Sequence, residues 1–286
     1  MTFTLTRLSP HTGAEITGID LTKPVDDPTC AALNRAFIDH HVLVFRDQKM
    51  PAHQLLDAVQ LFGEVFPQHN ARHKIPDCPL VHYISNQDTY EDGTRYIPGE
   101  GYHTDHSNDA HPPKATVLHA VTLPDHGGDT QFVNMYRAWD ELPEAMRRRI
   151  ESLKATHVFQ SRHSGRKLMK LSDERKSIVP DAVLHPIVRP HTETGRKAIY
   201  INPIRIEGIV GMEEQEALKL LDELLAFATQ EKFEYRHKWR NGDMVMWDNR
   251  CLLHKANGDY DMSQVRYLYR VMLKDEAVTE MVRLHA

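Results

Sequence analysis

The 286-residue chain has little cysteine and no long apolar run. Its three cysteines, Cys30, Cys78 and Cys251, are too few and too scattered for a disulfide framework, and they suit a reducing cytoplasm. No apolar stretch approaches the roughly 20 residues of a membrane span, and the opening MTFTLTRLSPHTG lacks the apolar core of a signal peptide. We therefore expect a cytoplasmic protein with no membrane partner.

Repeats, low-complexity tracts and Gly/Ser linkers are also missing, so we expect one domain over residues 1–286. A formal net charge of −5 gives no general reason to expect nucleic-acid binding. Histidine, by contrast, is abundant at 19 residues. With so many, a single histidine means little, and only spacing and context can mark one as a metal ligand.

The hydrophobic pattern predicts many short strands and a few helices. Helices are expected at residues 27–41, 51–62, 143–153 and 212–230, the last with an apolar stripe of Leu218, Leu221, Leu225 and Ala228. Strands are expected at residues 41–47, 114–123, 130–135, 182–191, 196–202, 233–239, 243–249 and 265–273. This mixture favours a mainly β fold with added helices, a sandwich or jelly roll, over a doubly wound parallel sheet.

Two segments have the composition of loops that could cover a site. Residues 64–100 are mostly polar and rich in turn formers, and residues 160–181 carry more basic than acidic side chains. Either segment could simply be solvated. Their positions also fit lids that order over a bound substrate.

The stretch GYHTDHSNDAHPP, residues 101–113, is dense in side chains that can bind a metal. In an extended segment, residues i and i+2 point the same way, so His103 and Asp105 share a face while His106 points away. A second histidine from a distant strand would complete a facial triad that leaves about half of an octahedral shell open, as non-haem Fe(II) oxygenases require. Taken alone, however, the pair also fits two hydrogen-bonded side chains on a loop.

An ordered set of motifs favours the metal. HTD at 103–105, GGDT at 127–130, WDNRxxxH at 247–254 and RxxxR at 266–270 together resemble the taurine and phenoxyacetate-herbicide dioxygenases, the TauD/TfdA family. The resemblance runs through nearly the whole chain. It implies a double-stranded β-helix core of the jelly-roll, cupin-like type, with Fe(II) as cofactor and 2-oxoglutarate and O2 as cosubstrates. It also implies that His103, Asp105 and His254 are the metal ligands.

The same resemblance assigns anion contacts. Thr130 and Arg266 are implied to bind the carboxylates of 2-oxoglutarate, and Arg270 an acidic group of the substrate. Strand geometry agrees, because Arg266 and Arg270 project from one face with backbones about 13 Å apart, far enough to serve different anions. Leu268 between them indicates a face turned inward. The alternatives are a β-branched residue that opens a strand for Thr130, and exposed surface positions for the two arginines.

The resemblance implies hydroxylation of a small organic anion of the aryloxyalkanoate, sulfonate or other carboxylate type, with C–O or C–S cleavage where the product collapses. Taurine itself is not expected, because the family's sulfonate contacts fall on Gln68, Ala71 and Gly99, although His69 enters register by a one-residue shift. Arg205 is either a second anion contact or a solvated loop arginine.

Two other classes of protein could carry part of this motif set. A non-catalytic jelly-roll binding protein would not need the metal-binding motifs together with Arg266. A Zn-dependent hydrolase could use two histidines and a carboxylate, but it would have no evident use for Thr130 and Arg266. A homo-oligomer is implied by the resemblance alone.

Overall fold

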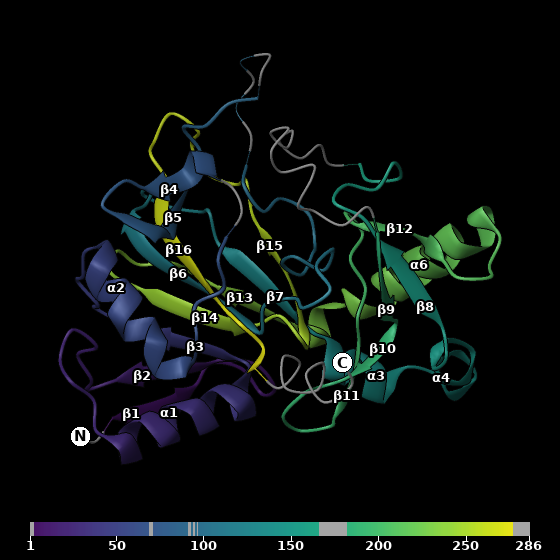
Figure 1. Ribbon diagram of the computed structural model, residues 1–286, viewed down its shortest axis with the longest axis horizontal. Coiled ribbons are helices and arrows are strands. Elements are labelled where there is room, and N and C mark those ends of the chain that lie inside the picture. Colours follow the sequence, from purple (N-terminus) through teal and green to yellow (C-terminus); the bar gives the residue numbers. More distant parts are fainter. Residues whose placement is uncertain are drawn as a thin grey trace.

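The computed structural model describes residues 3–68, 71–90, 93, 95, 97–165 and 182–276. Its largest element is an eight-stranded sheet with the order β1-β2-β3-β14-β6-β16-β5-β4 (Figure 1). In chain order the strands of this sheet are β1 Thr4–Arg7, β2 Ala14–Thr17, β3 Val42–Phe45, β4 Lys74–Ile75, β5 Cys78–Ser85, β6 Ala115–Thr122, β14 Met244–Asp248 and β16 Tyr267–Leu273. The β2–β3 pair is parallel and the other pairs are antiparallel.

A second, antiparallel sheet with the order β13-β7-β15 packs on one face of the large sheet. It consists of β7 Thr130–Asn134, β13 Glu234–His237 and β15 Leu252–Ala256. One apolar core joins the two sheets, since Val245 and Leu268 of the large sheet lie in the same buried cluster as Phe132 and Leu253 of the small one. These facing sheets are the jelly-roll core, as expected from the sequence.

Helices α1 Asp27–His40 and α2 Ala52–Val59 cover the other face of the large sheet. Strand β3 shows why both faces need cover: Val42 and Val44 point to the inner core, while Leu43 and Phe45 point to the helices. A strand buried on both sides reads as a continuous apolar run, here VLVF. The α1 helix begins where the Asp26 side chain accepts a hydrogen bond from the Thr29 backbone N–H.

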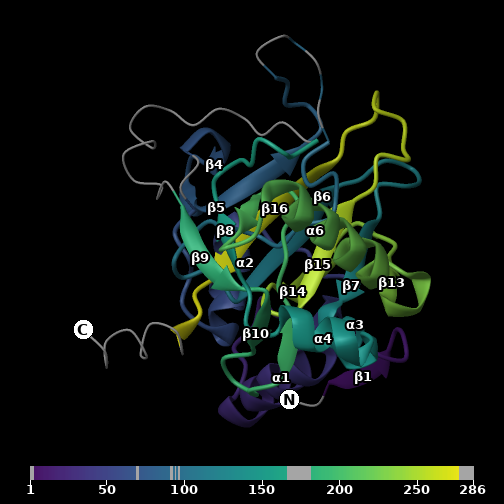
Figure 2. The same ribbon diagram turned by 90° about the vertical axis from the view of Figure 1, so that its right-hand side faces the viewer.

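A third group of elements lies at the right of Figure 1 and in front in Figure 2. It contains α3 Met135–Glu141, α4 Glu144–Ile150, α6 Glu214–Ala228, β8 Lys154–His157, β9 Val183–Pro186, β10 Val188–Pro190, β11 Lys197–Ile199 and β12 Ile206–Ile209. Strands β12-β8-β9 form one small sheet and β10-β11 another. No helix in the described part of the chain is long and apolar enough to cross a membrane.

Several elements differ from the sequence-based expectation. Residues 64–100 contain the eight-residue strand β5, which pairs with β16, so this segment is not all loop. Helix α3 and strand β15 were not anticipated, and residues 182–191 form two strands that pair with different partners. Most of the expected lid at 160–181 lies outside the described residues.

The buried stripe of α6 also differs from the predicted one. The helix buries Ala217, Leu220, Leu224 and Ala228, while Leu218, Leu221 and Leu225 lie at its half-buried flanks. Two leucine stripes lie side by side in LKLLDELL, so helical periodicity alone could not choose between them.

This difference can be tested with two matched substitutions. Leu220→Ala should lower the free energy of unfolding by about 2–5 kcal/mol, because it opens a cavity in the core. Leu218→Ala makes the same chemical change at a half-buried position and should cost about 1 kcal/mol or less. Urea denaturation of both variants measures the difference, and equal losses would contradict the assigned face.

Candidate metal centre and anion contacts

Two backbone hydrogen bonds bring His103 and His254 together. The His103 N–H donates to the His254 carbonyl at 2.9 Å, and the His254 N–H donates to the His103 carbonyl at 2.8 Å. This is an antiparallel bridge between the segment before β6 and strand β15. Directly opposed residues point to the same face, and the two imidazole centroids lie 4.3 Å apart.

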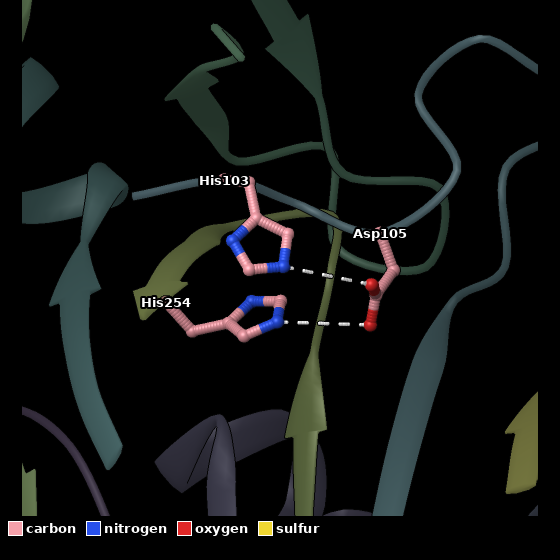
Figure 3. Close-up of side chains that lie close together, drawn as sticks. All are labelled: His103, Asp105 and His254. Atoms are coloured by element: carbon pink, nitrogen blue, oxygen red, sulfur yellow. Dashed lines mark ion pairs between the residues drawn. The ribbon is translucent and has the colours of Figure 1, made fainter. Parts of the chain in front are cut away.

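Asp105 completes the cluster, and Figure 3 shows its carboxylate turned toward both imidazoles. Its Oδ1 lies 3.9 Å from His103 Nε2 and its Oδ2 lies 3.7 Å from His254 Nε2. Each of the three residues offers one ligand atom, and these atoms all lie within 4.8 Å of one another. The two N···O separations exceed a hydrogen bond, but one ion with bonds of about 2.1 Å could bridge them.

The protonation states of His103 and Asp105 suit the binding of a cation. The Nδ1 of His103 lies 2.8 Å from the Gly101 carbonyl. A carbonyl only accepts, so Nδ1 carries the proton and Nε2 presents its lone pair. Burial alone would raise the pKa of the Asp105 carboxyl, but the two histidines, Arg270 and a hydrogen bond from Thr116 hold this pKa below its usual value. The carboxylate is therefore ionised at neutral pH.

The neighbouring side chains of the dense stretch lie outside this cluster. His106 has a left-handed backbone, with φ of 49°, and its ring packs 5.6 Å from that of Phe66. Asp109 accepts a hydrogen bond from the backbone N–H of His111. Among the described residues, His103 and Asp105 therefore lie in a cluster with His254 that does not include His106, Asp109 or His111.

Arg266 is a buried cation held by backbone. Its Nε donates to the Gly128 carbonyl at 3.1 Å, and its own N–H donates to Asn86 Oδ1 at 2.9 Å. Burial lowers the pKa of the Arg266 guanidinium to about 10, so the group is still charged at neutral pH. No ion pair joins it to a carboxylate among the described residues, since the nearby Asp129 pairs with Arg236 at 2.7 Å.

Glycine at 128 is required by this arrangement. Its φ of 69° favours glycine, and a Cβ there would lie 3.0 Å from the Arg266 Nε. Two residues later, Thr130 opens β7, and its hydroxyl oxygen accepts a hydrogen bond from the Trp239 indole at 3.0 Å. An indole N–H only donates, so the hydroxyl proton of Thr130 is left to donate to another group.

Arg270 lies on strand β16, which begins directly after Arg266. Its Nε donates to Gln68 Oε1 at 2.7 Å, and Gln68 Nε2 donates back to the Arg270 carbonyl at 3.1 Å. The positive charge of Arg270 contributes to the lowered pKa of Asp105. Leu268, between the two arginines, is fully buried in the inner core, as the sequence indicated.

Arg205 is half-buried in a turn and contacts Phe159. Its Nη1 donates to the Phe159 carbonyl at 2.5 Å, and its guanidinium lies 5.2 Å from the centroid of the Phe159 ring. Of the positions compared with the taurine branch, Gln68 is buried against Arg270. His69 and the side chain of Ala71 lie outside the described part of the chain.

Sequence reasoning missed Thr116, whose side chain contacts Asp105, and Asn249, whose side chain contacts Thr116. Thr116 donates to Asp105 at 2.6 Å, and Asn249 donates to Thr116 at 2.9 Å. Asn249 stands within the WDNR motif, so the motif marked its place but not its role. Thr116 carries no sequence signal beyond its position in a predicted strand.

Comparison with known proteins decides the family. The family model described as "Taurine catabolism dioxygenase TauD, TfdA family" matches residues 4–272. The chain belongs to this family. It is therefore a 2-oxoglutarate-dependent dioxygenase, with Fe(II) as its cofactor and O2 as the second cosubstrate.

Individual relatives cover nearly the whole chain. The α-ketoglutarate-dependent 2,4-dichlorophenoxyacetate dioxygenase of Cupriavidus pinatubonensis is 32% identical, over 95% of this chain and 97% of the relative. An alkylsulfatase of Acinetobacter baylyi is 30% identical, over 96% and 86%. The crystal structure of AAD-2 in complex with Mn(II) and N-oxalylglycine has a TM-score of 0.81 at 29% identity, over 96% and 98%. Neither a zinc hydrolase nor a non-catalytic binding protein has support among these relatives.

The three expected metal ligands can be separated from their neighbours by substitution. His103→Ala, Asp105→Ala and His254→Ala should each abolish Mn(II) binding, measured by calorimetry on the metal-free protein, because each removes one of the three expected ligands. His111→Ala, in the same dense stretch, should bind Mn(II) like the unaltered chain. An Asp105→Ala protein with unchanged affinity would refute the triad.

Proposed function

We propose that this dioxygenase hydroxylates a small organic anion, and that His103, Asp105 and His254 hold its Fe(II). The observation that carries this proposal is the joint presence of a three-ligand cluster and a buried arginine with no ionic partner among the described residues. Two imidazole nitrogens and one carboxylate are the donor set of non-haem Fe(II) oxygenases. When bound, the iron with 2-oxoglutarate and O2 supplies the oxidising power, and the protein supplies position and shelter.

Thr130 and Arg266 are the proposed contacts for 2-oxoglutarate. A buried guanidinium is stabilised by an anion that it can bind through two parallel hydrogen bonds, as it does a carboxylate. The Thr130 hydroxyl has its proton left to donate, because Trp239 already donates to its oxygen. Both groups lie around Gly128, whose missing side chain makes room for Arg266. These features support one arginine and one hydroxyl acting on a single dicarboxylate.

Arg270 is the proposed contact for the acidic group of the substrate. Gln68 holds this arginine at both its backbone carbonyl and its Nε, which limits the positions of the guanidinium. The 2,4-dichlorophenoxyacetate dioxygenase and the alkylsulfatase are named for substrates with a carboxylate and a sulfate ester. We propose that the substrate here carries such a group, a carboxylate, sulfonate or sulfate, and that C–O or C–S cleavage follows where hydroxylation makes the product unstable.

The wider organisation is also proposed on sequence grounds. A single catalytic domain over residues 1–286 is supported by the family match over residues 4–272. A cytoplasmic location is supported by three cysteines that form no disulfide. A homo-oligomer and the lack of a nucleic-acid partner rest only on family resemblance and on the net charge of −5.

The function can be tested without knowing the substrate. Under anaerobic conditions, Fe(II) and 2-oxoglutarate together should give a visible charge-transfer band that neither gives alone, because both must bind the same centre. With O2 admitted, a screen of small carboxylic, sulfonic and sulfuric acids should show succinate formation stimulated by the true substrate. Full turnover with Zn(II) and without 2-oxoglutarate would contradict the proposal.

A second experiment distinguishes the proposed roles of the two arginines. Loss of a hydrogen bond to a charged group costs about 1.5–3 kcal/mol, or roughly ten- to a hundredfold in affinity. Arg266→Ala should lower the affinity for 2-oxoglutarate by that factor, measured by titrating 2-oxoglutarate without substrate and following the charge-transfer band. Arg270→Ala should leave this affinity nearly unchanged. Arg270→Ala should instead raise the apparent KM for the organic acid.

Lysine substitutions give the control for charge alone. Arg266→Lys should recover only part of the affinity, because an ammonium cannot form the planar fork. If Arg270→Ala weakens 2-oxoglutarate as strongly as Arg266→Ala does, the two arginines share one anion and the substrate assignment fails.

A further inference from the structure

A chain of three buried hydrogen bonds ends on the carboxylate of Asp105. The Trp247 indole N–H donates to Asn249 Oδ1 at 3.1 Å, Asn249 Nδ2 donates to Thr116 Oγ1 at 2.9 Å, and Thr116 donates to Asp105 Oδ2 at 2.6 Å. All four residues are buried. The last bond has the short length of a hydroxyl donating to an ionised carboxylate.

The direction of this chain is fixed at its start. An indole N–H can only donate, so the amide oxygen of Asn249 must face Trp247 and the amide nitrogen must face Thr116. The Thr116 oxygen then accepts from Asn249, and its proton is available for Asp105. If the amide were reversed, two donors would meet at Trp247 and the Thr116 proton would turn toward Asn249, leaving Asp105 Oδ2 without this donor.

The sheet places these residues in register. Thr116 on β6 lies directly opposite Trp247 on β14, and the turn after β14 carries Asn249. The backbone of Asn249 is also tied to the ligand segment, because its carbonyl accepts a hydrogen bond from the Thr104 hydroxyl at 2.8 Å. From the turn that leads to His254, Asn249 therefore contacts this segment directly through Thr104 and indirectly through Thr116.

We propose that Thr116, oriented by Asn249 and Trp247, is a positioning residue for the metal ligand Asp105. Its hydroxyl donates to Oδ2 and fixes the orientation of the carboxylate. A hydrogen bond to a ligating carboxylate orients the ligand and tunes its affinity for the metal. This inference rests on the proposed assignment of Asp105 as an iron ligand.

The test measures Co(II) binding to the metal-free protein, by titration and by the visible spectrum of the bound ion. Thr116→Val keeps the shape of the side chain but removes the hydroxyl. It should lower the affinity for Co(II) about ten- to a hundredfold and alter the visible spectrum of the bound ion. Thr116→Ser returns the hydroxyl and should restore both. Trp247→Phe keeps an aromatic ring but removes the indole N–H. It should also lower the affinity for Co(II), by a smaller factor.

A matched control is Thr12→Val. The Thr12 hydroxyl is buried and also accepts a hydrogen bond from an asparagine amide, that of Asn134 at 2.9 Å, but it does not contact the metal cluster. This variant should bind Co(II) like the unaltered chain. A loss as large as that of Thr116→Val would show a general effect of removing a buried hydroxyl, and would overturn the proposal.

The other outcomes are also decisive. Unchanged Co(II) affinity and spectrum in Thr116→Val, or failure of Thr116→Ser to restore them, would overturn the positioning role. If Thr116→Val does not fold, Trp247→Phe decides in its place, and unchanged binding there would count against the inference. Failure of the underlying function looks different: Co(II) would then bind equally well to the Asp105→Ala protein.

Discussion

The backbone bridge between His103 and His254 is the constraint on which the site depends. The two residues are 151 positions apart in the sequence, yet each donates its N–H to the carbonyl of the other. Because opposed residues of an antiparallel pair share a face, this bridge orients both imidazoles without any ion. The rest of the fold keeps the bridge in place: β15 pairs with β7, and the core between the sheets buries Leu253 beside His254.

Charge is distributed around this bridge in a way that suits two anions and one cation. Asp105 supplies the negative charge for a metal, and its pKa is held below its usual value by His254, His103, Arg270 and the Thr116 hydroxyl. Burial lowers the pKa of Arg266, and no carboxylate among the described residues forms an ion pair with it. A buried unpaired charge destabilises a fold unless a ligand compensates for it, so Arg266 is better explained by binding than by stability.

The three proposed ligands were not equally predictable from the sequence. The i, i+2 relation of His103 and Asp105 follows from strand geometry, but His254 could be found only through the WDNRxxxH motif, because no local pattern reports a partner so far away. Thr116 could not be found, since its hydrogen bond to Asp105 depends on how the segment between the two residues folds back, which no local pattern reports. In the fold, the jelly roll was predictable from the many short strands. Strand β5 and the buried face of α6 were not predictable. The polar composition around β5 favoured a loop, and adjacent leucines in α6 gave two equally good apolar stripes.

The most direct test of this account is a crystal structure of the protein with Mn(II) and 2-oxoglutarate, grown without O2. The account predicts one ion bound by His103 Nε2, the Asp105 carboxylate and His254 Nε2, with the distal carboxylate of 2-oxoglutarate on Arg266 and the Thr116 hydroxyl still bound to Asp105. An ion held instead by His106, Asp109 or His111, or a 2-oxoglutarate that does not contact Arg266, would contradict it.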